Sequence, residues 1–407
     1  MRKKILIISD HALTHSGVAT QSRHLIEGLL NTEKFSVVQL GAAIKHLDYN
    51  EQQLTKDFKI IPMNNFGNEK IISSILEKEK PDVMIIFTDP RFFGHIFSMS
   101  KQIRKICPIM YWHVWDNRPT PIYNDYIYDS VDKIVAISRL TYSMCKENHR
   151  DKTVYIPHSL PSDTFYELPN NIKMQCKVKT LGENKKDNFI ALWLNRNCKR
   201  KRPGDVLKAW QIFLLNLEDK FKRKDATLIM HTNPNDVYGL NLLQVAKKLN
   251  ILDNVCFSDQ IVDFEHINAL HNISDICLNI SYSEGFGLST LESMQVGNPI
   301  IASQTGGLTN QVIDYNDGTK NGISLIPKVQ VLAGNQNTLY VYEDYVSVED
   351  TAKAIFDLYK MNSNDRKKLS NKCKKYVKKE FNYEKMINSW EEEIEKTMLE
   401  WKSNYDN

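Results

Sequence analysis

The chain has 407 residues, of which 42% are hydrophobic and 25% are charged. This composition is average for a globular protein and gives no reason to expect extended disorder, a fibre or a membrane protein. The length favours two domains over a single hydrophobic core. The 53 basic and 49 acidic residues leave a net charge of only +4, which by itself demands neither nucleic acid nor anionic lipid as a partner.

Membrane insertion and secretion are not expected from the apolar runs. The longest of them, such as 189–194, are far shorter than the roughly 20 residues that a membrane-spanning helix needs. The run at 5–8 is too short for the core of a secretory signal, and we expect a strand there. Seven cysteines form no C-x-x-C pair and are odd in number, which favours reduced thiols. We therefore expect a cytoplasmic protein without a transmembrane segment or a metal site.

In the first part of the chain, short β-branched runs alternate with segments of helical period. The pattern begins with a strand at 5–9, a helix at 20–30 and a strand at 36–40. Further strands are expected at 83–87, 108–113, 133–137 and 154–156. Such alternation predicts parallel strands joined by helical crossovers. We expect residues 1–170 to form one doubly wound domain.

A second domain of the same kind is expected over 188–383, after a polar linker at 171–187. Its expected strands are 189–194, 227–231, 255–257, 276–280 and 299–303, and its expected helices are 205–215, 240–249, 264–271 and 288–296. The segment 328–345 fits no strand–helix unit and is expected to be an irregular insertion. Residues 349–400 are expected to be largely helical. Ligands of parallel sheets bind at the carboxyl ends of the strands, so two such domains facing each other would enclose one cleft.

The most informative motif is SEGFGLSTLE, from Ser283 to Glu292, between a predicted strand and a predicted helix. Its glycines let the backbone approach a ligand, and the free N–H groups at the start of the helix favour a phosphate. Glu284 and Glu292 are eight residues apart and cannot contact the same atoms. One carboxylate could bind the hydroxyls of a sugar and the other those of a ribose. A capping loop followed by a surface glutamate is the alternative.

The run from Ser283 to Gly307 resembles the E-x7-E signature of the family 4 retaining glycosyltransferases, with that family's G-x-P-[IV]-I-A-S strand and Gly-Gly turn. The resemblance implies a GT-B fold, an α/β architecture of two Rossmann-like doubly wound domains facing a central cleft. It implies that 1–170 is the acceptor domain and that 188–383 is the nucleotide-sugar donor domain. It also implies that Glu284 binds the hydroxyls of the donor sugar and that Glu292 binds the ribose of its nucleotide.

The same resemblance implies that the diphosphate of the donor binds to backbone amides of the loop. The residues concerned lie around the start of the helix: Gly285, Phe286, Gly287 and Leu288. The nucleobase is expected to bind backbone groups of 261–263, which include Val262. Such contacts carry little side-chain information, so the base and the sugar stay open among UDP-, GDP- and ADP-sugars.

The run NRNCKRK, residues 195–201, follows the first strand of the second domain. Arg196 and Lys201 resemble the family's G-R-x4-K pair, which implies that they neutralise the diphosphate as the sugar leaves. Charge stabilisation of this kind counts for more in a dry cleft than in water, so no metal is required. A solvated loop or a nucleic-acid contact is the alternative. The neighbouring Lys199, Arg200 and Arg202 are left without a role.

The first domain carries weaker signals. Gly17 closes the loop after the first strand, where the family has a glycine-rich turn near the donor and the acceptor. His113, at the end of a predicted parallel strand, resembles the histidine with which the family contacts the donor sugar. A structural role is the alternative for a lone histidine. A helix over about 384–407 resembles the family's last helix, which packs back on the first domain.

The sequence also departs from the family pattern. His158 and Ser159 stand where the family has Asn and Gly, and Asn310-Gln311 stands where many members carry a glutamate. These differences leave the local turn after 156 open to question, although not the fold.

The resemblance implies a retaining transfer of a sugar from a nucleotide-sugar to a hydroxyl acceptor, with Glu284, His113, Arg196 and Lys201 as catalytic residues. The acceptor is open among a polysaccharide, a lipid-linked sugar reached by peripheral membrane contact, and another glycan. A phage-type enzyme that glycosylates hydroxymethylated DNA bases is one alternative, for which 199–202 would contact phosphates. A nucleotide-sugar-binding protein without catalysis and an epimerase acting on the nucleotide-sugar are the others.

Overall fold

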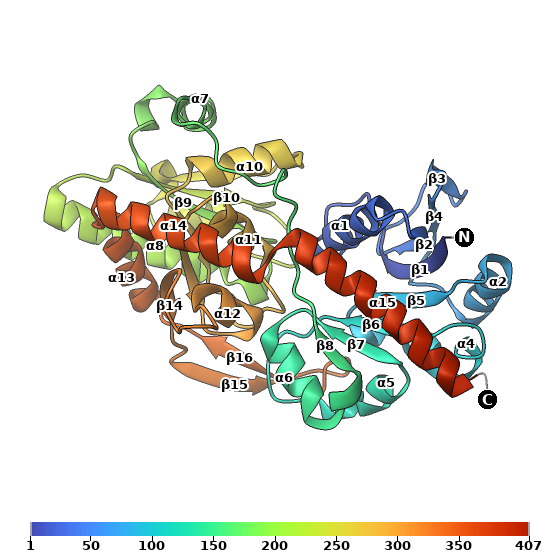
Figure 1. The fold of residues 1–407 in the computed structure, drawn as a ribbon. Coiled ribbons are helices and arrows are strands. Elements are labelled where there is room, and N and C mark those ends of the chain that lie inside the picture. The colour runs from blue at the N-terminus through green and yellow to red at the C-terminus, as the bar shows by residue number, and fades with distance from the viewer. Residues whose placement is uncertain (1, 406–407) are drawn as a thin grey trace. The chain divides into compact units, whose positions relative to one another are not determined.

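The computed structural model describes residues 2–405, which form two compact units, each with its own parallel sheet (Figure 1). Unit 1 comprises 2–159, 334–341 and 382–405, and unit 2 comprises 160–333 and 342–381. The chain therefore passes between the two units at four points, because a hairpin tip and the C-terminal helix belong to unit 1.

Unit 1 is built on a sheet with the strand order β3-β4-β2-β1-β5-β6-β7-β8, in which only β3 runs antiparallel to its neighbour. Its strands are β1 (Lys3–Asp10), β2 (Phe35–Ala42), β3 (Gln52–Thr55), β4 (Phe58–Pro62), β5 (Val83–Thr88), β6 (Ile109–His113), β7 (Lys133–Ala136) and β8 (Thr153–Tyr155). Its helices are α1 (Gly17–Asn31), α2 (Glu69–Glu79), α3 (Gly94–Ser98), α4 (Ser100–Ile103), α5 (Asp125–Asp129), α6 (Arg139–Asn148) and α15 (Tyr383–Tyr405).

Unit 2 is built on an all-parallel sheet with the strand order β11-β10-β9-β12-β13-β14. Its strands are β9 (Phe189–Leu194), β10 (Ala226–His231), β11 (Val255–Ser258), β12 (Ile276–Asn279), β13 (Ile300–Ser303) and β14 (Gly322–Leu325). Its helices are α7 (Asn170–Leu181), α8 (Pro203–Phe221), α9 (Leu242–Lys248), α10 (Phe264–Ile273), α11 (Leu288–Gln295), α12 (Thr309–Val312), α13 (Val348–Tyr359) and α14 (Ser363–Glu380).

The central strand β9 shows why unit 2 needs helices on both faces of its sheet. Phe189, Ala191 and Trp193 belong to the larger apolar cluster, which includes residues of α8 and α13. Ile190 and Leu192 belong to a second cluster, with residues of α10. Side chains alternate between the faces of a strand, so a strand covered on both sides reads as a continuous apolar run.

Two segments differ from their sequence-based prediction. The segment 171–187, expected to be a linker, is largely the helix α7, which has no fully buried residue and hence little apolar period to detect. Cys176 and Leu181 nevertheless pack against the second apolar cluster of unit 2. The segment 328–345, expected to be irregular, forms a two-stranded sheet of β15 (Val329–Ala333) and β16 (Val341–Tyr345).

The C-terminal helix α15, red in Figure 1, is a structural part of unit 1. Trp390 is fully buried, with its ring centre 5.0 Å from that of Trp112. Gly28 on α1 makes room for this helix, because a Cβ there would lie 2.1 Å from Ile387 Cδ1. Residues 406 and 407 of the predicted helix lie outside the described part of the chain.

Within residues 2–405, none of the helices combines the length and the apolar character that a membrane span requires.

The burial of Trp390 predicts how strongly α15 stabilises unit 1. Trp390→Ala should lower the free energy of unfolding by about 3–5 kcal/mol, because it removes a fully buried ring and leaves a cavity against Trp112. Unfolding by urea measures the loss. The exposed Glu392→Ala on the same helix is the control and should change stability by less than about 0.5 kcal/mol. Equal stability of the two variants would contradict a stabilising role for the Trp390 ring.

Candidate active site

The loop between β12 and α11, residues 280–287, depends on two glycines for its shape. Gly287 has a φ of +92° and precedes the first turn of α11, and a Cβ there would lie 2.5 Å from Leu308 Cδ2. Gly307 donates its N–H to Glu284 O over 2.9 Å, and its Cβ would lie 2.4 Å from Gly285 O. A larger side chain at either position would separate this loop from the Gly-Gly turn.

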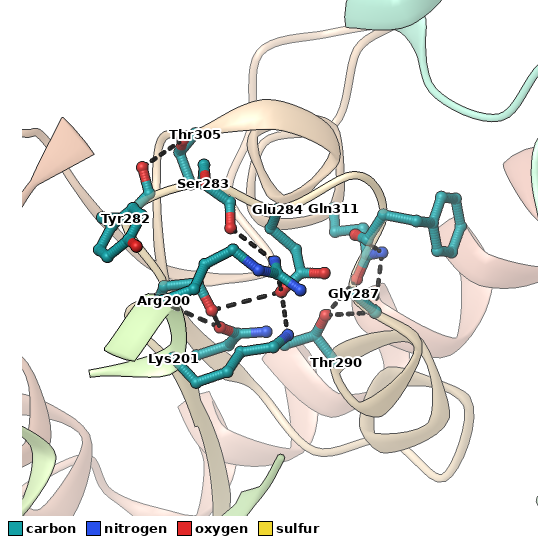
Figure 2. A network of polar contacts seen from close by, with 12 residues as sticks. Arg200, Lys201, Tyr282, Ser283, Glu284, Gly287, Thr290, Thr305 and Gln311 are labelled. Carbon is teal, nitrogen blue, oxygen red and sulfur yellow. Dashed lines mark hydrogen bonds and ion pairs between the residues drawn. The ribbon is translucent and has the colours of Figure 1, made fainter. Parts of the chain in front are cut away.

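Gln311 fixes the same loop from inside the fold, as Figure 2 shows. Its side chain is fully buried and donates to Phe286 O over 2.8 Å and to Gly287 O over 3.1 Å. Its Oε1 accepts a hydrogen bond of 2.5 Å from Thr290 Oγ1. A carboxylate at this position could not donate to two carbonyl groups. The departure from the family pattern at Asn310-Gln311 therefore supplies a rigid support for the loop.

Glu284 lies in this loop with two cations on its carboxylate (Figure 2). The Nζ of Lys201 forms an ion pair with Oε2, and Arg200 Nη1 lies 3.3 Å from the same oxygen. Arg200 also donates to Ser283 O over 2.8 Å. Ser281 Oγ lies 3.3 Å from Oε2 as a further donor. Residues from two loops of unit 2 thus meet at one carboxylate, which is only 7% exposed.

The charge of Glu284 is set by opposing effects. Burial by itself raises the pKa of the carboxyl group, but the ion pairs with Lys201 and Arg200 outweigh burial and lower the pKa to about 2. The carboxylate is therefore ionised throughout the neutral range. It can accept hydrogen bonds from hydroxyl groups but has no proton to give.

The structure brings Lys201 to Glu284, whereas Arg196 lies elsewhere in unit 2. The Nε of Arg196 donates to Asp236 Oδ2 over 2.9 Å, and its guanidinium carbon lies 4.8 Å from the centre of the Tyr238 ring. Its side chain is 61% exposed. An approach of Arg196 to a ligand on the Glu284 loop would require release of Asp236. The second cation at Glu284 is Arg200, to which the sequence analysis gave no role.

The 3-10 turn Lys199–Lys201 explains why adjacent residues act together. In such a turn the side chains at consecutive positions diverge, so Arg200 and Lys201 approach the carboxylate from different directions. The only signal in the sequence was the KRK run itself, which indicates charge but no orientation.

Asn197 is a second residue that sequence reasoning missed. It is fully buried, donates to Leu240 O over 2.7 Å and accepts from Leu240 N over 3.1 Å. Gly239 leaves room for it, since a Cβ at that position would lie 2.1 Å from Asn197 Oδ1. These bonds hold the loop after β10 against the loop after β9.

Glu292, the second glutamate of the E-x7-E motif, is 8% exposed and projects from α11 toward α10. Its Oε2 lies 3.0 Å from Nε2 of His271, which is fully buried. A contact with a ribose therefore has to share the carboxylate with this histidine. His271 is the last residue of a predicted helix, a position that carries no chemical signal in the sequence.

Val262 lies in the loop between β11 and α10 and is half-buried, while the neighbouring Ile261 is 78% exposed. Asp263 ends the loop as the N-cap of α10, because its side chain accepts from His266 N over 2.9 Å. This loop lies at the carboxyl end of β11, and its contact with the nucleobase stays a prediction.

In unit 1, Gly17 is the first residue of α1, and Ser16 is the N-cap. The Ser16 hydroxyl accepts from Ala19 N over 3.0 Å and donates to Asp10 Oδ2 over 2.6 Å. The loop after β1 therefore ends at the N-cap Ser16, and Gly17 is the first residue of the capped helix.

His113 is 1% exposed, and both ring nitrogens are hydrogen-bonded to tyrosine hydroxyls. Nε2 lies 2.9 Å from Tyr128 Oη, and Nδ1 lies 3.1 Å from Tyr111 Oη. Burial lowers the pKa of the imidazole to about 3, so the ring is neutral. In this structure both ring nitrogens are already hydrogen-bonded, so neither is left to bond a donor sugar. These bonds favour the structural role that was the alternative for it.

His158 also has a place in the core of unit 1. Its ring centre lies 5.2 Å from that of Trp112 and 5.6 Å from that of Phe87. Burial lowers the pKa of this imidazole to about 3 as well. The His158-Ser159 departure thus fills an aromatic cluster, and Ser159 O accepts from Gln21 Nε2 over 3.1 Å.

Comparison with known proteins decides the family. Residues 177–380, about half of the chain, match the family described as glycosyl transferases group 1. The chain belongs to this family. An uncharacterized glycosyltransferase of Methanocaldococcus jannaschii is 25% identical, over 97% of this chain and 99% of its own length. The protein is accordingly an enzyme of the glycosyltransferase class.

Solved structures show the GT-B fold. A glycosyltransferase from Rickettsia africae superposes with a TM-score of 0.73 at 18% identity, over 98% of this chain and 99% of its own. HepE of Anabaena, solved in complex with UDP and glucose, superposes with a TM-score of 0.71 at 15% identity, over 97% of this chain and 100% of its own. The predicted pair of Rossmann-like α/β domains is therefore confirmed as the fold of this group 1 glycosyltransferase.

The ion pairs at Glu284 predict a pH dependence of stability. Because the pKa falls from 4.5 to about 2 on folding, the ionised carboxylate stabilises the native state above about pH 4.5, and this contribution is lost as the pH falls toward 2. Its size is about 3 kcal/mol. Glu284→Gln should lower stability at pH 7 by about that amount and flatten the acid limb, because a neutral amide cannot pair with Lys201 and Arg200.

Urea unfolding at a series of pH values from 7 to 3 measures both effects. Glu265→Gln, on an exposed residue of α10, is the matched control and should keep the wild-type profile. Parallel profiles for Glu284→Gln and the wild type would contradict the assignment of the shift to these ion pairs.

Proposed function

We propose that this glycosyltransferase moves a sugar from a nucleotide-sugar donor to a hydroxyl acceptor with retention of the anomeric configuration. The observation that carries the proposal is the meeting of Lys201, Arg200 and Glu284 beside the N-terminus of α11. Two cations, a helix dipole and one ionised carboxylate are what a diphosphate next to a sugar requires.

The diphosphate has a place at the start of α11. Gly287 carries no side chain to cap the helix, so the amides of the first turn are left for a ligand. Leu288, the first residue of the helix, is half-buried, while residues 283–287 immediately before it are buried. Lys201 and Arg200 add positive charge from the neighbouring loop. UDP is the first nucleotide to test, because HepE was solved with UDP and glucose.

The carboxylate of Glu284 suits the hydroxyls of the donor sugar. Its lowered pKa keeps it ionised at neutral pH, so it is an acceptor of hydrogen bonds and a poor general acid. A donor diphosphate would compete for Lys201 and Arg200 and release part of the carboxylate for the sugar. Glu284 then orients the sugar without attacking its anomeric carbon.

The proposed reaction takes a front-face route, which the absence of an attacking carboxylate role for Glu284 favours. The bond between the anomeric carbon and the diphosphate oxygen breaks, the acceptor oxygen bonds to the same face, and its proton passes to the leaving diphosphate. Retention results because both bonds lie on one face of the sugar. Positioning of the two substrates and stabilisation of charge on the leaving group supply most of the rate.

Transfer to DNA has less support than transfer to a glycan or a lipid-linked sugar. Of the cations at 199–202, Arg200 and Lys201 contact Glu284, and Arg202 is buried with bonds to Asp205 and Val346. Only Lys199 is exposed, which leaves little positive surface for a phosphate backbone.

Substitutions in the site test the proposed function. Glu284→Ala and Lys201→Ala should each lower kcat/KM for UDP-sugar turnover by about 100-fold or more, because each removes charge or orientation needed as the sugar leaves. Arg196→Ala should show a comparable loss if Arg196 leaves Asp236 to bind the diphosphate. Lys208→Ala, on an exposed lysine of α8, is the control and should retain wild-type turnover. Near-normal turnover of Glu284→Ala and Lys201→Ala would overturn the assignment.

Removal of metal ions tests the role of the cations. Since Lys201 and Arg200 already place two positive charges at the proposed diphosphate site, EDTA should leave turnover within about twofold of its initial value. The assay compares EDTA-treated enzyme with and without added Mg²⁺ or Mn²⁺. A complete loss that either ion restores would show that the two side chains do not suffice.

A further inference from the structure

The two glutamates of the E-x7-E motif lie in opposite electrostatic surroundings. Glu284 has Lys201 and Arg200 on its carboxylate, whereas Glu292 has no ion pair with a lysine or an arginine within residues 2–405. The side chain of Glu292 is nevertheless only 11% exposed. A carboxylate that is shielded from water without a cation depends on hydrogen-bond donors. What Glu292 can bind therefore depends on how many of these donors the protein itself supplies.

The protein supplies one donor, His271. Its Nε2 lies 3.0 Å from Glu292 Oε2, and no other group in the described part of the chain bonds this carboxylate. The second ring nitrogen, Nδ1, is buried and has no hydrogen-bond partner among the same residues. A proton on Nδ1 would leave a buried donor unsatisfied, which favours the tautomer with its only proton on Nε2. His271 thus donates to Glu292.

The other carboxylate oxygen, Oε1 of Glu292, is left for a ligand. It makes no hydrogen bond within residues 2–405, although each oxygen of a carboxylate has two acceptor positions. Unlike Nδ1 of His271, it is not sealed from solvent. A hydroxyl group can therefore donate to Oε1 while His271 donates to Oε2.

His271 is held in one orientation by its surroundings. The residue is fully buried, and the centre of its ring lies 5.8 Å from that of Phe165 at an angle of 81°. The backbone is held as well, because His271 O accepts from Asn298 Nδ2 over 2.5 Å and from Ser274 N over 3.2 Å. A donor fixed in this way loses no freedom when a ligand binds, so it can keep the Glu292 carboxylate in place beforehand.

Other polar atoms without partners lie at the carboxyl edge of the unit 2 sheet. The strands β9, β10 and β12 each end at or next to a buried polar atom that makes no hydrogen bond among the described residues: Asn195 Nδ2, Thr232 Oγ1 and Asn279 Nδ2. Nearly all buried polar groups of native proteins are bonded, so such a set indicates a polar ligand.

Glu292 belongs to the same edge of the sheet. His231 is the last residue of β10. Burial and the nearby His271 lower the pKa of His231, whereas the charge of Glu292 acts in the opposite direction. The three side chains are thus close together, at the end of the strands where ligands of parallel sheets bind.

We propose that His271 is a positioning residue, which holds Glu292 so that its Oε1 accepts from a ribose hydroxyl of the donor nucleotide and thereby makes the enzyme selective for ribonucleotides. Glu292 lies four residues after Leu288, which is about 6 Å along the axis of α11. This short separation suits a nucleoside diphosphate, whose ribose is joined to its first phosphate by a single CH2–O link. The inference rests on the proposed function, because it needs a diphosphate at the start of α11.

Binding of deoxynucleotides tests the inference. Isothermal titration compares UDP with 2′-deoxy-UDP and 3′-deoxy-UDP, and GDP or ADP with its deoxy forms replaces them if it binds more tightly. The wild type should bind the weaker of the two deoxynucleotides at least about tenfold less tightly than the ribonucleotide, because a hydrogen bond to a charged group is lost. Equal affinity for the ribonucleotide and both deoxynucleotides would overturn the proposal.

Three variants separate the hydrogen bond from packing. His271→Phe keeps a buried ring but no donor, and the preference for the ribonucleotide should fall to about threefold or less. His271→Gln, whose amide can donate, should keep a preference within about threefold of that of the wild type. Phe165→Leu disturbs the packing of His271 without removing its bond and should keep the wild-type preference. A wild-type preference in His271→Phe, or the same loss in Phe165→Leu, would contradict the role of the bond.

Removal of Glu292 shows whether His271 acts through it. Glu292→Ala should itself lower the preference to about threefold or less. In that background His271→Phe should change the preference by less than about twofold, because the two residues act as a unit. A further large loss in the double variant would show that His271 contacts the nucleotide directly and would overturn its role as a positioning residue.

Nucleotide binding by the wild type distinguishes failure of this inference from failure of the proposed function. If the wild type binds UDP, but with no preference for the ribonucleotide or with one that His271→Phe does not change, the inference is wrong and the proposed donor site stands. If the wild type binds no nucleoside diphosphate, the proposed function is wrong, and the inference that rests on it is wrong as well.

Discussion

The carboxylate of Glu284 is only 7% exposed, and a buried carboxylate has to be paired or neutralised. This requirement determines how the loops around Glu284 in unit 2 are arranged. Glu284 keeps its charge because Lys201 and Arg200 reach it from the loop after β9. The same contacts tie that loop to the start of α11. Burial and pairing therefore create, before any donor arrives, a fixed arrangement of one negative and two positive charges beside a helix N-terminus. Pre-arranged charge of this kind does not have to be reorganised during the reaction.

Neutral side chains keep this arrangement rigid. Gln311 holds the backbone of the Glu284 loop through two carbonyl groups, and Asn197 holds the loop after β10 against the loop after β9. Both amides are fully buried, so a broken bond would leave an unsatisfied polar group in the interior. Amides serve this purpose better than carboxylates, because each one donates and accepts without adding charge to the site.

The sequence predicted most of the repeating architecture, and the reasons are visible in single elements. β9 was predicted at 189–194 and is found at Phe189–Leu194, since a strand covered on both faces reads as one apolar run. The helix α7 was missed because its residues are not fully buried on any face. The E-x7-E motif indicated where the loop lies, but not that Arg200 would reach Glu284 while Arg196 pairs with Asp236. Orientation within a short turn depends on tertiary contacts, which a single sequence does not contain. His113 shows the same limit, because its partner Tyr128 comes from a different element of unit 1.

The segment 328–345, which was expected to be an irregular insertion, has the clearest structural consequence. β16 places Asp344 where its N–H binds Tyr282 O and its carboxylate accepts from Thr305 Oγ1 over 2.8 Å, so the insertion is bonded to both the Glu284 loop and the Gly-Gly turn. The next residue, Tyr345, lies over the guanidinium of Arg202, with 5.2 Å from its ring centre to Cζ. A segment added to the outside of a fold can change specificity only if it reaches the reacting groups without disturbing them. In this chain the insertion is joined by one backbone hydrogen bond to the residue two positions before Glu284. This bond leaves the Glu284 carboxylate and its two cations in place.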